Sequence, residues 1–91
     1  MILGKVIGSI WATHKEVGMS HLKLLMIEPI NMRDEVVGQP IIAADRIGAG
    51  QGEVVIISRG SPARTIFDKN TPVDAVVVGI VDSLEVRDEF D

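Results

Sequence analysis

The 91-residue sequence contains no cysteine and no tyrosine, and its only aromatic residues are one tryptophan and two phenylalanines. Without cysteine there is neither a disulfide framework nor a thiolate metal site. This composition suits a reducing compartment and favours a cytoplasmic location. Two histidines, His14 and His21, lack the further ligands that a structural zinc ion needs, so we expect no metal and no cofactor.

Basic runs are also missing, since nine Lys and Arg face thirteen Asp and Glu, for a net charge of −4. Oligonucleotide sites combine a basic groove with aromatic platforms. Here only Trp11, Phe67 and Phe90 could stack on bases, so no nucleic-acid partner is expected. The longest apolar run, residues 75–81, is far shorter than the roughly 20 residues of a membrane helix, and Lys5 interrupts the apolar start of the chain. We therefore expect no membrane partner and no secretory signal.

Aliphatic residues are what the chain has in excess. Hydrophobic residues make up 46% of the sequence, and the mean hydropathy is +0.29. A single domain of this length, spanning 1–91, buries only about 60% of its unfolded surface. A small domain with more apolar surface than it can bury usually covers the rest in a subunit interface, which predicts a homo-oligomer.

Five extended segments alternate with polar or glycine-rich loops. Gly4 and Gly8 lie inside the first segment, where glycines mark a bulge or a sharp bend. The last segment is continuously apolar, which predicts burial on both faces. The expected strands are 2–13, 22–30, 41–45, 53–59 and 73–81.

A short helix is predicted after the fourth strand, because Ser61 can cap it and Pro62 suits its first position. It ends at 70–72, where a proline follows Asn and Thr. The acidic tail, 84–91, is expected to fray. The sequence thus predicts a mainly β fold, a small, partly open, five-stranded OB-like β-barrel with one short helix after the fourth strand.

The stretch between the third and fourth strands carries three glycines in five residues, Gly48, Gly50 and Gly52. A phosphate-binding glycine loop requires a helix behind it and a Gly-Lys-Ser/Thr signature. A strand follows instead, and the signature is absent. The loop is therefore predicted to serve positive φ angles or the close approach of another backbone.

Catalytic chemistry finds no support in the spacing of the polar residues. The segment 59–63 lacks the second glycine of a nucleophile elbow. Three carboxylates, Asp45, Asp74 and Asp82, border strands in apolar surroundings. They are predicted to form ion pairs, with Arg46, Arg59 and Arg64 as candidate partners, or turn-capping hydrogen bonds. Within an assembly they could fix the register between subunits.

Several motifs, taken in order, resemble the EutN/CcmL family, the pentameric vertex proteins of bacterial microcompartment shells. They are Gly4-Lys5-Val6, Trp11-Ala12-Thr13, Leu22 to Leu25, Asp45 to Glu53, Ser58 to Arg64, Pro72 to Ala75 and Gly79 to Asp82. The resemblance covers residues 2 to about 85. The segment 31–39 and the acidic tail match least.

The resemblance implies a structural protein that is not an enzyme. It implies a pentamer at the fivefold vertices of a polyhedral shell, with hexameric microcompartment shell proteins as partners. An OB-type binding module for nucleic acid or protein is the alternative. The assembly and interface candidates are Asp45, Gly48, Ala49, Gly50, Gly52, Arg59, Gly60, Ser61, Ala63, Arg64, Asp74 and Asp82.

Overall fold

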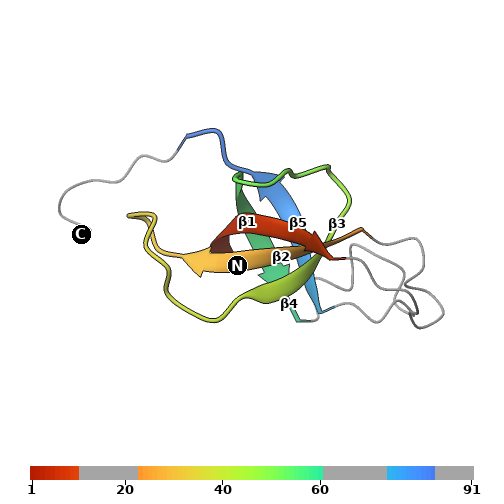
Figure 1. Cartoon of the computed structure of the whole chain (residues 1–91), viewed down its shortest axis with the longest axis horizontal. Helices are drawn as coiled ribbons and strands as arrows, with labels where there is room; N and C mark the ends of the chain where they lie inside the picture. The colour runs from red at the N-terminus through yellow and green to blue at the C-terminus, as the bar shows by residue number, and fades with distance from the viewer. Residues whose placement is uncertain (11–22, 61–73, 84–91) are drawn as a thin grey trace.

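The chain folds into a five-stranded barrel in the computed structural model, which describes residues 1–10, 23–60 and 74–83 (Figure 1). The strands are β1 (Ile2–Ile10), β2 (Lys23–Ile30), β3 (Ile41–Asp45), β4 (Val54–Arg59) and β5 (Ala75–Ile80). They close in the order β1-β2-β3-β5-β4. The mainly β, OB-like fold is thus confirmed, but the expectation of a partly open barrel is wrong.

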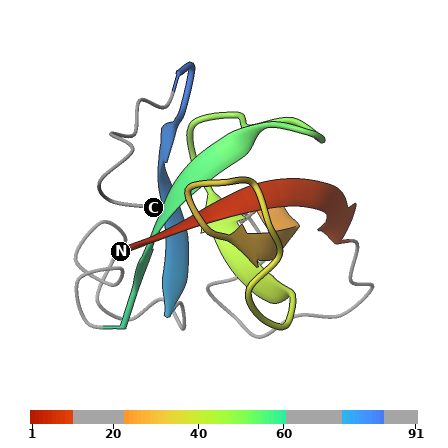
Figure 2. The same ribbon diagram turned by 90° about the vertical axis from the view of Figure 1, so that its left-hand side faces the viewer.

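Closure depends on two pairings that join strands distant in sequence. The first four residues of β1 pair antiparallel with β4, from Ile2↔Ile57 to Lys5↔Val54. On the opposite side, β3 and β5 meet in a short parallel contact through Ala44↔Val76 and Asp45↔Val77. The end-on view shows β1 crossing over β4 and β5 (Figure 2). These pairings leave the barrel without an open side, which local sequence patterns do not reveal.

The predicted strand bounds agree with the structure to within one or two residues wherever both can be compared. The third strand is as expected, and the fourth begins one residue later than predicted. The expected helix within 61–73 and the frayed tail 84–91 lie outside the described residues. Within the described ranges, no helix is long and apolar enough to cross a membrane.

The core is aliphatic and draws on every strand. Leu25, Ile27, Val55 and Ile57 are at most 1% exposed. The first half of β5 is buried throughout, as its continuous apolar run predicted, and its second half is partly exposed. Tight packing of this kind makes the core sensitive to changes of even one methylene group.

The two glycines of β1 have different roles. A Cβ atom at Gly4 would overlap the side chain of Ile27 and lie 3.0 Å from Ile57 Cδ1, so Gly4 lets two core side chains meet the strand backbone. Next to Gly8 the β1–β2 register shifts between Val6 and Gly8, which is a bulge. No heavy atom of the described residues lies within 4 Å of a Cβ built at Gly8. The expected bulge is therefore present, and Gly4 instead permits close packing.

Candidate functional site: the loop between β3 and β4

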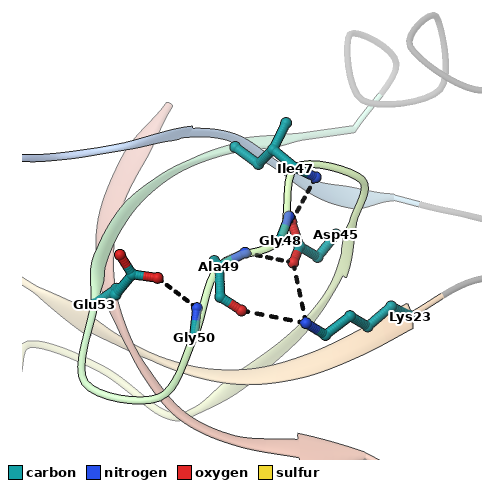
Figure 3. Close-up of polar contacts among 7 residues, drawn as sticks. All are labelled: Lys23, Asp45, Ile47, Gly48, Ala49, Gly50 and Glu53. Carbon is teal, nitrogen blue, oxygen red and sulfur yellow. Dashed lines mark hydrogen bonds and ion pairs between the residues drawn. The ribbon is translucent and has the colours of Figure 1, made fainter.

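The loop between β3 and β4 is organised by one buried carboxylate (Figure 3). The side chain of Asp45 has 0% exposure. Its Oδ1 accepts hydrogen bonds from the backbone N–H groups of Ile47 at 3.0 Å and Gly48 at 3.2 Å. Its Oδ2 accepts one from Ala49 N at 2.8 Å. Three consecutive backbone donors thus converge on one carboxylate, which is the turn-capping arrangement rather than an ion pair alone.

A lysine that sequence reasoning missed lies beside this carboxylate. Lys23 Nζ is 3.8 Å from Asp45 Oδ2 and donates a hydrogen bond to Ala49 O at 3.4 Å. The Lys23 side chain is half exposed. Its Cα partner across the antiparallel β2–β3 pair is Asp45. A lysine opening an apolar strand opposite an aspartate was the available signal, but it requires the register of two strands to be known.

The second half of the loop is held to β1. Glu53 Oε1 accepts a hydrogen bond from Gly50 N at 2.5 Å. Gly52 N donates to Val6 O at 2.8 Å, and Val6 N donates to Glu53 O at 2.9 Å. The loop is therefore joined at its far end to the barrel wall, close to the bulge of β1.

These contacts explain why the glycine-rich sequence is not a phosphate cradle. In such a cradle, successive backbone N–H groups point at the ligand. Here the N–H groups of 47–49 point at Asp45, and those of Gly50 and Gly52 point at Glu53 and Val6. The donors that a phosphate would need are bound to oxygen atoms of the chain itself.

The three glycines are not equivalent. Gly48 and Gly52 have φ angles of +87° and +88°, a region that residues with a side chain rarely adopt. Gly50 has no positive φ, and a Cβ built there would lie 3.4 Å from Glu53 Oε1. No heavy atom of the described protomer lies within 4 Å of a Cβ built at Gly48 or Gly52. Within the protomer, positive φ rather than close approach requires glycine at these two positions.

The loop turns one side chain inward and another outward. Ala49 is 1% exposed and belongs to the core cluster with Val6 and Ile57. Ile47, two residues earlier, is 49% exposed. Two other large exposed apolar side chains, Met26 and Ile42, are Cα partners across β2 and β3. The barrel thus presents apolar side chains to solvent on and beside β3.

The remaining candidates are spread over the structure. Arg59 and Asp82 are exposed. Gly60 has a φ of +74° and donates its N–H to Asp74 O at 2.7 Å. Asp74 is exposed in the protomer. Its predicted ion pair stays a prediction, because Arg64, one of its candidate partners, lies outside the described residues.

Other predicted residues lie in ranges that the structure does not describe. They are Trp11, His14, His21, Ser61, Ala63, Arg64, Phe67 and Phe90. Among the residues that are described, no group of three or more His, Cys, Asp or Glu could hold a metal ion.

A second organised loop, 31–40, connects β2 to β3. Asn31 Oδ1 accepts hydrogen bonds from Arg33 N at 2.8 Å and Glu35 N at 3.0 Å. The loop presents Met32, Val36 and Val37 to solvent, each more than half exposed. They lie near a groove of about 770 Å³ whose lining includes residues of β1, β2 and the loop.

An ion pair joins this second loop to the barrel. Lys5 Nζ lies 2.8 Å from both Asp34 oxygens. Asp34 has a φ of +66°, the only positive value among the described residues other than glycine. Aspartate tolerates this conformation better than most residues. The Lys5 pair, 33% and 59% exposed, therefore fixes a strained turn at the surface.

Comparison with known proteins identifies the family. Residues 1–82 match the EutN_CcmL family, described as ethanolamine utilisation protein EutN/carboxysome. The chain belongs to the EutN/CcmL family. This confirms the resemblance inferred from the motifs.

Relatives in this family match the chain over almost its whole length. The bacterial microcompartment shell vertex protein GrpN of Rhodospirillum rubrum (strain F11) is 43% identical over 86 residues, which are 93% of this chain and 97% of GrpN. The bacterial microcompartment shell vertex protein EutN of Escherichia coli (strain K12) is 45% identical over 85 residues, covering 92% and 90% of the two chains.

Solved structures of EutN/CcmL relatives share the fold. Gloeobacter violaceus CcmL superposes with a TM-score of 0.88 at 40% identity, covering 94% of this chain and 90% of that one. The GrpN pentameric microcompartment shell protein from Rhodospirillum rubrum gives a TM-score of 0.84 at 42% identity, covering 94% and 100%. The barrel described above is therefore the fold of pentameric relatives.

Proposed function

We propose that this chain is a structural shell protein of a bacterial microcompartment in the cytoplasm, where five copies form a ring that closes a fivefold vertex. Hexagonal tiles alone form a flat sheet, so a closed polyhedral shell requires fivefold positions. The partners are other copies of this chain within the ring and hexameric shell proteins around it. The chain performs no catalysis in this role, and it requires no cofactor.

One observation carries the proposal: the match to GrpN, a pentameric microcompartment shell protein, spans 94% of this chain with a TM-score of 0.84. A pentameric shell protein of another compartment, MSM0273, shares the fold at 32% identity with a TM-score of 0.78. At this coverage and identity, the shared fold extends over almost the whole length of both chains. The fivefold ring is then the arrangement that the family fold supports best.

The surface of the barrel agrees with a ring. Met26 and Ile42, paired across β2 and β3, are 38% and 55% exposed, and Ile47 beyond the end of β3 is 49% exposed. Exposed apolar side chains of this kind are available to an interaction surface. A head-to-tail interface whose rotation closes produces a ring and covers one such surface on every copy. Within this proposal, the twelve candidate residues serve assembly, with the β3–β4 loop facing a neighbouring copy.

An OB-type binding module remains the alternative function. Oligonucleotide binding by such barrels depends on aromatic side chains that stack on bases. The described ranges, which include all five strands, contain no aromatic residue. The strand faces therefore lack the stacking platforms that this alternative requires.

Sedimentation velocity at micromolar concentration tests the proposal. A pentamer of 9.8-kDa chains has a mass of about 49 kDa. We expect a single species of that mass and no binding of single-stranded oligonucleotides. A stable folded monomer would refute the ring, and a monomer that binds oligonucleotide would establish the alternative. Co-expression with hexameric shell proteins, followed by electron microscopy, tests the vertex position: omitting this chain should leave open or tubular shells.

A further inference from the structure

We propose that Asp45 is the positioning residue that shapes the β3–β4 loop for ring assembly, by acting as a built-in anion in a nest of backbone N–H groups. This inference rests on the proposed ring. The inference adds a specific cause to the proposed ring: the Asp45 side chain sets the position of the loop and of Ile47 when two copies meet.

The geometry of Asp45 is that of a bound anion. Successive backbone N–H groups in loops form concave sites that bind anions. Ile47, Gly48 and Ala49 supply three such donors at 2.8–3.2 Å, and the ligand is a carboxylate two to four residues earlier in the same chain. The positive φ of Gly48 lets these donors face one point.

The Asp45 carboxylate is buried, so it needs hydrogen-bond donors and an opposite charge nearby. Its side chain has 0% exposure, and a buried charge is costly unless it is hydrogen-bonded and paired. The three N–H donors satisfy its oxygens, and Lys23 Nζ at 3.8 Å offsets its charge. An apolar residue of similar size would leave three donors in this loop without their partner.

The same hydrogen bonds hold the inward-facing residue of the loop, Ala49, and the outward-facing one, Ile47. Ala49 N is bound to Oδ2, and the Ala49 side chain packs in the core. Ile47 N is bound to Oδ1, and the Ile47 side chain is half exposed. We assign a neighbouring copy of the chain to this surface, since the proposed ring needs an exposed apolar contact on each copy and relatives with this fold are pentameric. Loss of the carboxylate would remove the hydrogen bonds that hold the backbone at both residues.

Chemical rescue of Asp45→Gly tests the inference. This variant removes the carboxylate and leaves room for formate in the nest. We expect its melting temperature to fall by on the order of 10 °C and its ring fraction to drop in sedimentation velocity. Sodium formate should restore a substantial part of both. Gly4→Ala, destabilised by a clash in the core rather than by a missing anion, is the control that formate should not rescue beyond its effect on the wild type.

Two further variants keep the test decisive if Asp45→Gly does not fold. Asp45→Asn retains one oxygen acceptor, and we expect a smaller loss of ring with no formate response, because the amide occupies the nest. Ile47→Ser should weaken ring formation at least tenfold, and its melting temperature should fall only by the contribution that ring formation makes to stability.

The outcomes separate the two proposals. A wild-type ring that Asp45→Gly and Asp45→Asn leave intact overturns this inference alone. Equal formate effects on Asp45→Gly and Gly4→Ala also overturn it, as does rescue of melting without any change in assembly. A monomeric wild type refutes the proposed ring, while formate rescue of melting would still identify Asp45 as the anion of the nest.

Discussion

The two loops on either side of β3 are both organised around one Asx side chain, but at different depths. In the 31–40 loop, Asn31 Oδ1 accepts hydrogen bonds from two backbone N–H groups. The Asn31 side-chain amide N–H donates to Glu35 Oε1 at 3.0 Å. All of these contacts are exposed. In the β3–β4 loop, Asp45 accepts three backbone N–H groups with its side chain fully buried.

This difference in burial decides how much Asn31 and Asp45 each contribute to the stability of the fold. Water can replace a lost hydrogen bond at the surface, whereas a buried donor left without a partner costs about 1–3 kcal/mol. The β3–β4 loop also inserts Ala49 into the core, while the 31–40 loop directs Met32, Val36 and Val37 to solvent. The same local motif therefore supports the fold in one loop and displays a surface in the other.

The largest contrast between the loops is expected from adding a charge. Ala49→Lys places an ammonium group in the core, where it has no partner, and should lower the free energy of unfolding by more than about 4 kcal/mol. Val36→Lys, in the exposed loop, should change it by less than about 0.5 kcal/mol. Urea unfolding at a fixed protomer concentration measures both, since ring formation makes stability depend on concentration. Equal effects would show that the loops do not differ in burial.

Substitution of the two capping side chains, Asp45 and Asn31, provides the second contrast between the loops. Asp45→Ala should cost about 3 kcal/mol because one buried and two part-buried donors lose their acceptor, whereas Asn31→Ala should cost about 1 kcal/mol. Thermal unfolding by circular dichroism, with both variants at the same concentration, gives the difference. A cost at Asn31 as large as that at Asp45 would contradict the explanation by depth.

Glycine substitutions sharpen the comparison within the β3–β4 loop. Gly52→Ala forces a residue with a Cβ to hold a φ of +88°, which should cost about 1–2 kcal/mol. Gly50→Ala has no such requirement, and we expect a change within about 0.5 kcal/mol. Chemical denaturation of the pair measures this, and a larger cost at Gly50 would point to close approach by another chain.

The smallest effect is expected at the ion pair of the 31–40 loop. Lys5→Met removes the contact with Asp34, which is partly exposed, and surface pairs contribute about 0–1 kcal/mol. We expect a loss near 0.5 kcal/mol that disappears at 1 M salt, because salt screens exposed charges. A loss that persists at high salt would mean that Lys5 acts through packing and not through charge.

Much of the fold could be predicted from the sequence. The apolar runs and the glycine-rich or polar breaks between them placed the strands. The continuous run 73–81 predicted burial on both faces, which holds for Ala75–Val77, whereas 78–80 are partly exposed. Closure was not predictable, because β4 must pair with residues of β1 that lie 49 to 55 positions earlier, from Lys5↔Val54 to Ile2↔Ile57. The helix expected after β4 stays a prediction.

The candidate site was predicted only in part. Asp45 and the glycines stood out as residue types, and the strand after them argued against a phosphate loop. Which two glycines hold positive φ could not be read from their spacing, because Gly48, Gly50 and Gly52 follow the same pattern. The exposure of Asp74 in the protomer could not be predicted, since charge and neighbouring apolar residues do not determine it.

The sequence by itself determined the β strands, the excess of aliphatic surface and the family, because these depend on local pattern and on motif order. Only the tertiary structure decided that Lys23 stands beside Asp45 and that Ala49 turns inward while Ile47 turns outward. These facts depend on the register of β2 against β3 and on the convergence of three N–H groups on one carboxylate. Both arise from contacts between strands, which exist only once the barrel has closed.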